Sequence, residues 1–273
     1  MRQRRVTGIE ERLAPYSDLI LRHVDNTAQS VPQQDSSLEF AGAWPQDSNA
    51  YNFARLSSPQ KYYLRWYQRP SELYGIPKSF DRIYAEFGCG RGNFINTLAG
   101  NDPEGLYIGI EGCKTIVLRA IQKTHAAGLQ NLFYIDSFVN DAATAFEEET
   151  LDGIFLNFSD PWPKERHAGR RLTAPAKAES YKRVLKPGGF VVFKTDSEAF
   201  FNYSLKSFKE EGFQIVIADN GSAIADLKIV ITSEAKQSST LFDVAAIAAA
   251  IPTEYEERFR ALSKAIYSFQ ATR

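Results

Sequence analysis

The sequence has few cysteines, no long run of apolar residues and no excess of either charge. Its two cysteines, Cys89 and Cys113, stand far apart without CxxC spacing, which argues against a disulfide framework and against a zinc site. No apolar run approaches the length of a bilayer span, and Met1–Arg5 is followed by polar residues instead of the apolar core of a signal peptide. We therefore expect a soluble, cytoplasmic protein that binds no metal and no membrane.

Positive and negative side chains almost balance along the chain. There are 32 Lys and Arg against 33 Asp and Glu in 273 residues, so the formal net charge is -1. This balance excludes a globally basic protein, and any binding of nucleic acid must depend on local clusters of cations. Apolar residues make up 44% of the sequence, which is ample for a hydrophobic core.

From Arg82 onward, short apolar runs alternate with stretches of helical periodicity. Strands that alternate with helices at this spacing are typical of an α/β fold with a doubly wound, mostly parallel sheet. We expect the last segment, Ile251–Arg273, to end the chain as a helix-like tail. The expected strands cover residues 82–87, 106–110, 132–135, 153–158, 190–195 and 213–218, and the expected helices cover residues 93–99, 114–127, 141–146, 176–184 and 197–211.

Residues 1–58 differ from the rest because they join a short amphipathic stretch to a polar segment rich in Ser, Gln, Asp and Asn. We interpret them as an N-terminal extension with little structure of its own, and we assign residues 59–273 to the main domain. In Pro59–Tyr74, aromatic residues are interleaved with cations, which suits either the stacking of bases or packing against the edge of the domain. We expect a packed helix or a connector in Thr232–Ala250.

A glycine-rich loop, EFGCGRG at Glu86–Gly92, follows the first expected strand and precedes the first expected helix. Gly88, Gly90 and Gly92 allow the backbone to turn sharply and to approach a ligand closely. Their GxGxG spacing differs from the GxGxxG fingerprint of dinucleotide-binding folds, which disfavours NAD.

Acidic residues at the ends of the first three expected strands indicate the kind of ligand. Glu86, at the mouth of the glycine loop, would repel a pyrophosphate but attract a cation. Glu111 can accept hydrogen bonds from both hydroxyls of a ribose. Asp136 or, as an alternative, Asp141 can contact an adenine after the third strand. A sulfonium with an ammonium group meets these preferences, so we predict that S-adenosylmethionine is the cofactor.

The segment Phe155–Leu172 reads FLNFSDPWPKERHAGRRL and places a carboxylate and a group of cations on one loop. Asp160 follows a strand-like run, and the carboxyl ends of strands are where open α/β sheets bind their ligands. Pro161 and Pro163 hold the following residues in a stiff, extended loop. Residues 164–171 carry a local charge of +3, from four cations and Glu165, and form the best phosphate clamp in the chain; the cations are Lys164, Arg166, Arg170 and Arg171.

These motifs resemble those of the tRNA (guanine-N7-)-methyltransferases, which are class I S-adenosylmethionine-dependent methyltransferases. The resemblance implies a Rossmann-like domain that transfers a methyl group from S-adenosylmethionine to N7 of a guanine in tRNA, in its variable loop. The segments that carry it are EFGCGRGNF from Glu86, GIEGCKTIVLRAIQK from Gly109, FSDPWPKERHAGRRL from Phe158, LKPGG from Leu185 with KTD at Lys194–Asp196, and TEYEERF from Thr253.

The same resemblance implies the roles of individual residues. The cofactor contacts come from Glu86, Glu111, Asp136 and Asp160, and Asp160 also contributes to catalysis. The contacts to the guanine nucleotide or the tRNA come from Lys164, Asp196, Thr253 and Glu256.

The chemistry of guanine N7 makes a strong general base unnecessary. N7 carries a free lone pair, so the site must align the base and stabilise the positive charge that passes to the purine. Asp160 can accept hydrogen bonds from guanine N1–H and N2–H, which selects guanine over adenine. N7 faces the deep, narrow groove of A-form RNA, so we expect the target in a loop or splayed out of a helix.

Several alternatives stay open from the residues alone. A tRNA-binding module without turnover would keep the same fold, and a methyltransferase for a small molecule or a protein would not need the cluster of cations. Trp162 can stack on the base or anchor the loop. Asp196 can cap the helix that follows it, and Thr253 with Glu256 fits a capping box. Both a monomer and a homodimer are compatible with the sequence.

Overall fold

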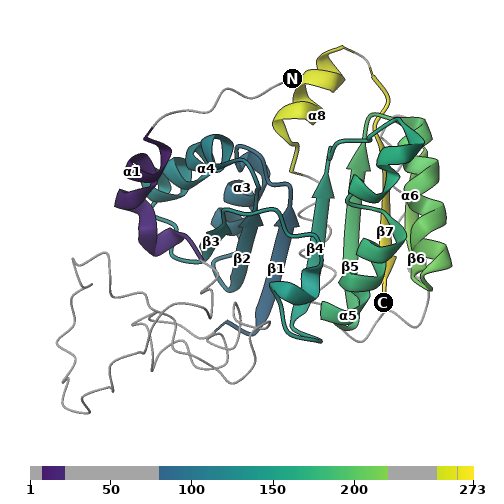
Figure 1. Cartoon of the computed structure of the whole chain (residues 1–273), viewed down its shortest axis with the longest axis horizontal. Helices are drawn as coiled ribbons and strands as arrows, with labels where there is room; N and C mark the ends of the chain where they lie inside the picture. Colours follow the sequence, from purple (N-terminus) through teal and green to yellow (C-terminus); the bar gives the residue numbers. More distant parts are fainter. Residues whose placement is uncertain (1–7, 22–79, 221–250, 263) are drawn as a thin grey trace.

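The computed structural model describes residues 8–21, 80–220, 251–262 and 264–273 (Figure 1). Three segments for which we made predictions therefore lie outside the described residues: the basic Met1–Arg5, the aromatic and basic Pro59–Tyr74, and Thr232–Ala250. None of the helices in the described ranges is long and apolar enough to cross a membrane.

The core of the molecule is a seven-stranded sheet in the order β3-β2-β1-β4-β5-β7-β6. Strands β3, β2, β1, β4 and β5 are all parallel, whereas β7 runs antiparallel to both β5 and β6. The predicted doubly wound, mostly parallel sheet is thus confirmed. The strands are β1 (Arg82–Phe87), β2 (Gly105–Ile110), β3 (Leu132–Ile135), β4 (Leu151–Asn157), β5 (Leu185–Thr195), β6 (Gln214–Asn220) and β7 (Tyr267–Thr272).

Helices cover both faces of the sheet, because alternate residues of the buried strands feed two hydrophobic clusters. One cluster joins Ile83 and Ala85 of β1 to α5 (Pro175–Val184) and α6 (Glu198–Glu210). The other cluster contains Tyr84 and the apolar residues of α3 (Asn93–Asn101) and α4 (Lys114–Ala127). The strand order reverses between β1 and β4, and open α/β sheets bind their ligands in the crevice at the carboxyl ends of the strands beside such a switch point.

The C-terminal segment differs from the helix-like tail that we expected. Helix α8 (Glu254–Ala261) is followed by β7, which inserts between β5 and β6. Phe269 and Ala271 are buried in the core on one side of β7, while Gln270 on the other side is partly exposed. This alternation has the period of two that a strand requires, and it is visible in the sequence YSFQAT.

Residues 8–21, a part of the predicted N-terminal extension, pack against the sheet domain. They form α1 (Ile9–Leu13) and the 3₁₀ helix η1 (Ala14–Leu19). Leu13, the last residue of α1, is fully buried. The Leu21 amide donates a hydrogen bond of 2.6 Å to the Tyr134 carbonyl of β3. Since β3 is at the edge of the sheet, this segment protects an otherwise open strand edge.

Replacing Phe269 with Ala should lower the free energy of unfolding by about 3–5 kcal/mol, because the ring fills the centre of the core under β7. Its centroid lies 5.1 Å from that of Phe193 and 5.3 Å from that of Phe208. The matched control is Gln270→Ala in the same strand, which should change stability by less than about 1 kcal/mol. Chemical denaturation measures both, and similar values for the two variants would contradict the central place of β7.

Candidate functional site

The glycine loop crosses from β1 to α3 at the carboxyl edge of the sheet. Gly90 has a φ of 56°, which favours glycine, and a Cβ at this position would meet no atom within 4 Å. The backbone above Gly90 is therefore open to a ligand. Gly92 serves a different purpose, since a Cβ there would lie 2.5 Å from the Cβ of Ala120 in α4. This third glycine lets the start of α3 pack against α4.

Glu111, directly after β2, braces the glycine loop with its carboxylate. Its two oxygens accept hydrogen bonds from the Gly90 amide at 3.2 Å and the Cys113 amide at 2.8 Å. Burial raises the pKa of the Glu111 carboxyl, and the charge of Asp160 acts in the same direction. Asp160, which follows β4 and is exposed, is therefore near enough to Glu111 for its charge to act on that carboxyl. The Glu111 carboxylate can still accept a hydrogen bond from a hydroxyl of a ligand.

Glu86 in β1 is the most deeply buried carboxylate of the crevice, with an exposed fraction of 2%. Its Oε1 accepts a hydrogen bond of 2.9 Å from Asn157 Nδ2, but its Oε2 has no hydrogen-bond partner among the described residues. Burial raises the pKa of Glu86 to about 8, against the opposing effects of Asn157 and Lys194. A buried acceptor of this kind is completed by a proton or by a cationic donor. It therefore fits the ammonium group of S-adenosylmethionine.

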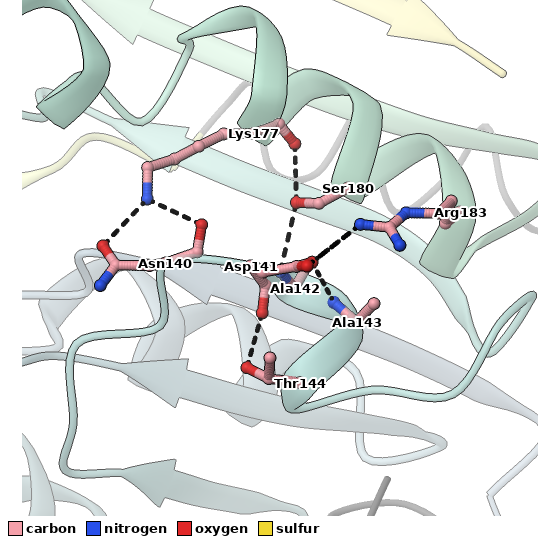
Figure 2. A network of polar contacts seen from close by, with 8 residues as sticks. All are labelled: Asn140, Asp141, Ala142, Ala143, Thr144, Lys177, Ser180 and Arg183. Atoms are coloured by element: carbon pink, nitrogen blue, oxygen red, sulfur yellow. Dashed lines mark hydrogen bonds and ion pairs between the residues drawn. The ribbon is translucent and has the colours of Figure 1, made fainter. Parts of the chain in front are cut away.

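The structure distinguishes the two carboxylates proposed for the adenine. Asp141 caps the 3₁₀ helix η3 (Ala142–Thr144) by accepting from the Ala143 amide, and both of its oxygens lie 3.1 Å from Nη2 of Arg183 in α5 (Figure 2). Asp141 is thus committed to the junction between η3 and α5. Asp136 directly follows β3 and lies 3.6 Å from Lys114 Nζ. This arrangement favours Asp136 for the adenine contact, which stays a prediction.

Phe138 is a candidate that sequence reasoning missed. It is 76% exposed, and its ring lies against Gly112, where a Cβ would come within 2.3 Å of the ring. An apolar ring exposed between Asp136 and Glu111 suits the face of a purine. The only signal in the sequence is an aromatic residue two positions after the acid that ends the third strand.

The loop that carries Asp160 is held in an unusual backbone conformation. Phe158 and Trp162, on either side of Asp160, have φ values of 49° and 41°, which non-glycine residues rarely adopt. Buried Arg171 supports this loop from behind: its Nε donates to the Pro161 carbonyl at 3.0 Å and its Nη2 to the Trp162 carbonyl at 3.1 Å. The Arg171 guanidinium also lies 4.1 Å from the ring centre of Tyr203.

These contacts correct the predicted phosphate clamp. Arg171 is turned inward and positions the loop, so it does not belong with the exposed cations. Lys164, Arg166 and Arg170 are exposed on or beside the 3₁₀ helix η4 (Glu165–Arg170). Trp162 lies edge-on to the His167 ring, with Arg170 5.0 Å from its centre, which favours the loop-anchor role over stacking on a base.

The side chains of Thr253 and Glu256 also point inward, contrary to the substrate contacts that we expected. Thr253 Oγ1 accepts a hydrogen bond of 3.0 Å from the Glu256 amide, as in the alternative of a helix cap. The Glu256 carboxylate is buried and lies 3.2 Å from Nζ of Lys194, the penultimate residue of β5. This ion pair holds α8 above the carboxyl ends of β4 and β5 (Figure 1).

Two neighbouring residues remain accessible beside Asp160. Tyr255 of α8 is exposed and stacks on Phe158, with ring centres 6.3 Å apart. Asp196 is only partly exposed and lies 3.5 Å from Lys264 Nζ. It does not cap α6, because the cap is Ser197, whose side chain accepts from the Phe200 amide. In the described part of the chain no group of three or more His, Cys, Asp and Glu could hold a metal ion.

Known proteins are similar to this chain over most of its length. The family described as "Putative methyltransferase" matches residues 81–269. The chain is 37% identical over 190 residues to a tRNA (guanine-N(7)-)-methyltransferase of Brevibacillus brevis, covering 70% of this chain and 80% of that protein. It is 35% identical over 225 residues to the protein of the same name from Bacillus subtilis, covering 82% and 93%.

Among solved structures, the fold is similar to that of the 16S rRNA methyltransferase KamB. The TM-score is 0.51, the sequence identity is 12%, and the match covers 72% of this chain and 90% of KamB. At this identity the similarity concerns the fold alone.

Replacing Arg171 with Ala should lower the free energy of unfolding by about 2–3 kcal/mol, because two loop carbonyls lose a charged donor. The matched control is Arg166→Ala, which removes an exposed cation from the same segment and should change stability by less than about 0.5 kcal/mol. Thermal and chemical denaturation compare the two. An equally small effect of both substitutions would contradict the supporting role of Arg171.

Proposed function

The chain belongs to the family of tRNA (guanine-N(7)-)-methyltransferases, and from this premise we propose how its described residues bind the cofactor and the target guanine. It is an S-adenosylmethionine-dependent enzyme that methylates N7 of guanine in tRNA. The observation that carries the proposal is the convergence of Glu86, Glu111 and Asp160 from three neighbouring strands on one crevice, where the strand order reverses.

S-adenosylmethionine, when bound, supplies a methyl group that is activated by its attachment to a sulfonium. Glu86 receives the ammonium group on its unpaired Oε2, and the open backbone at Gly90 leaves room for the chain beside it. Glu111 accepts hydrogen bonds from the ribose hydroxyls. Asp136 and the exposed ring of Phe138 contact the adenine. Along the edge of the sheet, the side chains thus follow the order of the cofactor's groups: the amino-acid end, the ribose and the adenine.

Asp160 is the residue that holds the target guanine. Its carboxylate is exposed at the mouth of the crevice, where it can accept from N1–H and N2–H and leave N7 free to receive the methyl group. It also compensates the positive charge that develops on the purine. The exposed ring of Tyr255, stacked on Phe158 beside Asp160, offers a surface on which the base can stack.

The exposed cations of η4 contact the phosphates around this guanine. Lys164, Arg166 and Arg170 project from a segment that begins four residues after Asp160, so they are close enough to bind the same strand of RNA. Because N7 cannot be reached inside an A-form helix, the target must be unstacked. From the resemblance to the family, we propose that it lies in the variable loop of the tRNA. We further assign the enzyme to the cytoplasm, where its two cysteines, Cys89 and Cys113, would stay reduced.

The test of the function is transfer of labelled methyl groups from S-adenosylmethionine to bulk tRNA, followed by chain scission at N7-methylguanine. We expect label in the variable loop, and an Asp160→Asn variant should lose at least about 100-fold in kcat/KM, since the amide removes the anionic acceptor. Glu165→Gln, an exposed carboxylate nearby, is the control and should retain its rate. Scission in a stem would contradict the variable loop, and a normal rate for Asp160→Asn would contradict its role.

The affinity for S-adenosylhomocysteine should rise with pH below about 8. Burial raises the pKa of Glu86 to about 8, so at pH 6 the free enzyme holds a proton there that a cationic ligand must displace. The affinity should therefore fall about ten-fold for each pH unit below 8 and level off above it. Calorimetry from pH 6 to 9 measures this, and Glu86→Gln should abolish most of the dependence. A wild-type affinity that is constant between pH 6 and 8 would contradict the assignment.

A further inference from the structure

Three neighbouring strands end in polar residues that are buried on the same face of the sheet. Tyr84, Phe155 and Val192 belong to the hydrophobic cluster on the α3 and α4 side. Because side chains alternate along a strand, the residues two positions further on point to the same side. They are Glu86 of β1, Asn157 of β4 and Lys194 of β5, with exposed fractions of 2%, 7% and 4%.

These three residues form a polar row that steps by two residues between β1 and β4. Glu86 pairs with Phe155, and Asn157 pairs with Lys194. Asn157 donates to Glu86 Oε1 at 2.9 Å, and Lys194 lies 3.2 Å from Glu256. With both carboxylates ionised, Glu86, Lys194 and Glu256 carry a net charge of about -1. The row therefore matches a ligand group with a single positive charge.

Two acceptors in this row remain without a hydrogen-bond partner among the described residues: Oε2 of Glu86 and Oδ1 of Asn157. When Glu86 is ionised, as it must be to bind a cation, the Asn157 amide cannot be reversed, because its oxygen would then face the Glu86 carboxylate. Buried acceptors are nearly always satisfied in folded proteins. Two unsatisfied acceptors on residues that are hydrogen-bonded to each other indicate a ligand group that donates to both of them. An ammonium group can do this, because it has three N–H donors.

We propose that Asn157 is a second acceptor for the ammonium group at the amino-acid end of the methyl donor, beside Glu86. This inference rests on the proposed function, which supplies a ligand with such a group. An amide suits the position better than a carboxylate. Two carboxylates this close to each other could not both be ionised, whereas Asn157 adds an acceptor and leaves the charge of the row unchanged.

The test compares two ligands that differ at the proposed contact. S-adenosylhomocysteine carries the amino-acid end, and 5′-methylthioadenosine lacks it. Calorimetry on the full chain measures both affinities without turnover. In Asn157→Leu we expect the affinity for S-adenosylhomocysteine to fall about ten-fold or more, and that for 5′-methylthioadenosine to change by less than about two-fold. Asn101→Leu, at the exposed end of α3, is the control and should leave both affinities unchanged.

Asn157→Asp separates the contact from an effect on folding. This side chain has the same shape, can share one proton with Glu86 and still offers an acceptor, so S-adenosylhomocysteine should bind within about three-fold of its wild-type affinity at pH 7. If Asn157→Leu lowers the affinities for both ligands equally, or lowers neither, the role of Asn157 is overturned while the proposed function still stands. Failure of the wild-type protein to bind either ligand would instead overturn the proposed function, and the inference with it.

Discussion

The site depends on a carboxylate that is almost completely withdrawn from water. Glu86 is buried at the end of β1, and the low polarity of its surroundings raises its pKa to about 8. Burying a charge is costly unless partners compensate it, and the structure supplies these partners from neighbouring strands. Asn157 donates to one oxygen, the charge of Lys194 opposes the effect of burial, and the other oxygen has no partner in the described ranges. In the proposed function, the ammonium group of the cofactor is the partner of this second oxygen.

The C-terminal segment is tied to the same region through a buried ion pair. Lys194 pairs with Glu256 and its charge also acts on Glu86, so one cation compensates a carboxylate in β1 and holds α8 in place. A buried ion pair adds little net stability, but it is a demanding contact that favours one arrangement of the chain. Here it brings Tyr255 beside Phe158 at the mouth of the crevice. The insertion of β7 between β5 and β6 anchors the other end of α8.

The cations of the loop after β4 have two different environments. Lys164, Arg166 and Arg170 are exposed and available to phosphates, whereas Arg171 is buried and donates to the carbonyls of Pro161 and Trp162. The planar guanidinium with several donors suits this second task, since it supports two carbonyls at once. Two residues with φ values near 45° depend on that support. Asp160 is thereby presented on a rigid loop, as alignment of a base requires.

The sequence by itself determined the α/β class, the five parallel strands and the glycine loop, because these depend on local periodicity and on glycines at short spacing. It also placed Glu86, Glu111 and Asp160 at strand ends, which a parallel sheet must bring to one edge. Only the tertiary structure decided which polar groups face a ligand and which face the protein. Arg171, Thr253 and Glu256 turned out to be buried, and Asp141 is paired with Arg183, since the fold brings these partners to them. The strand β7 was missed for a similar reason: six residues with a period of two become a strand only when two neighbouring strands accept their hydrogen bonds.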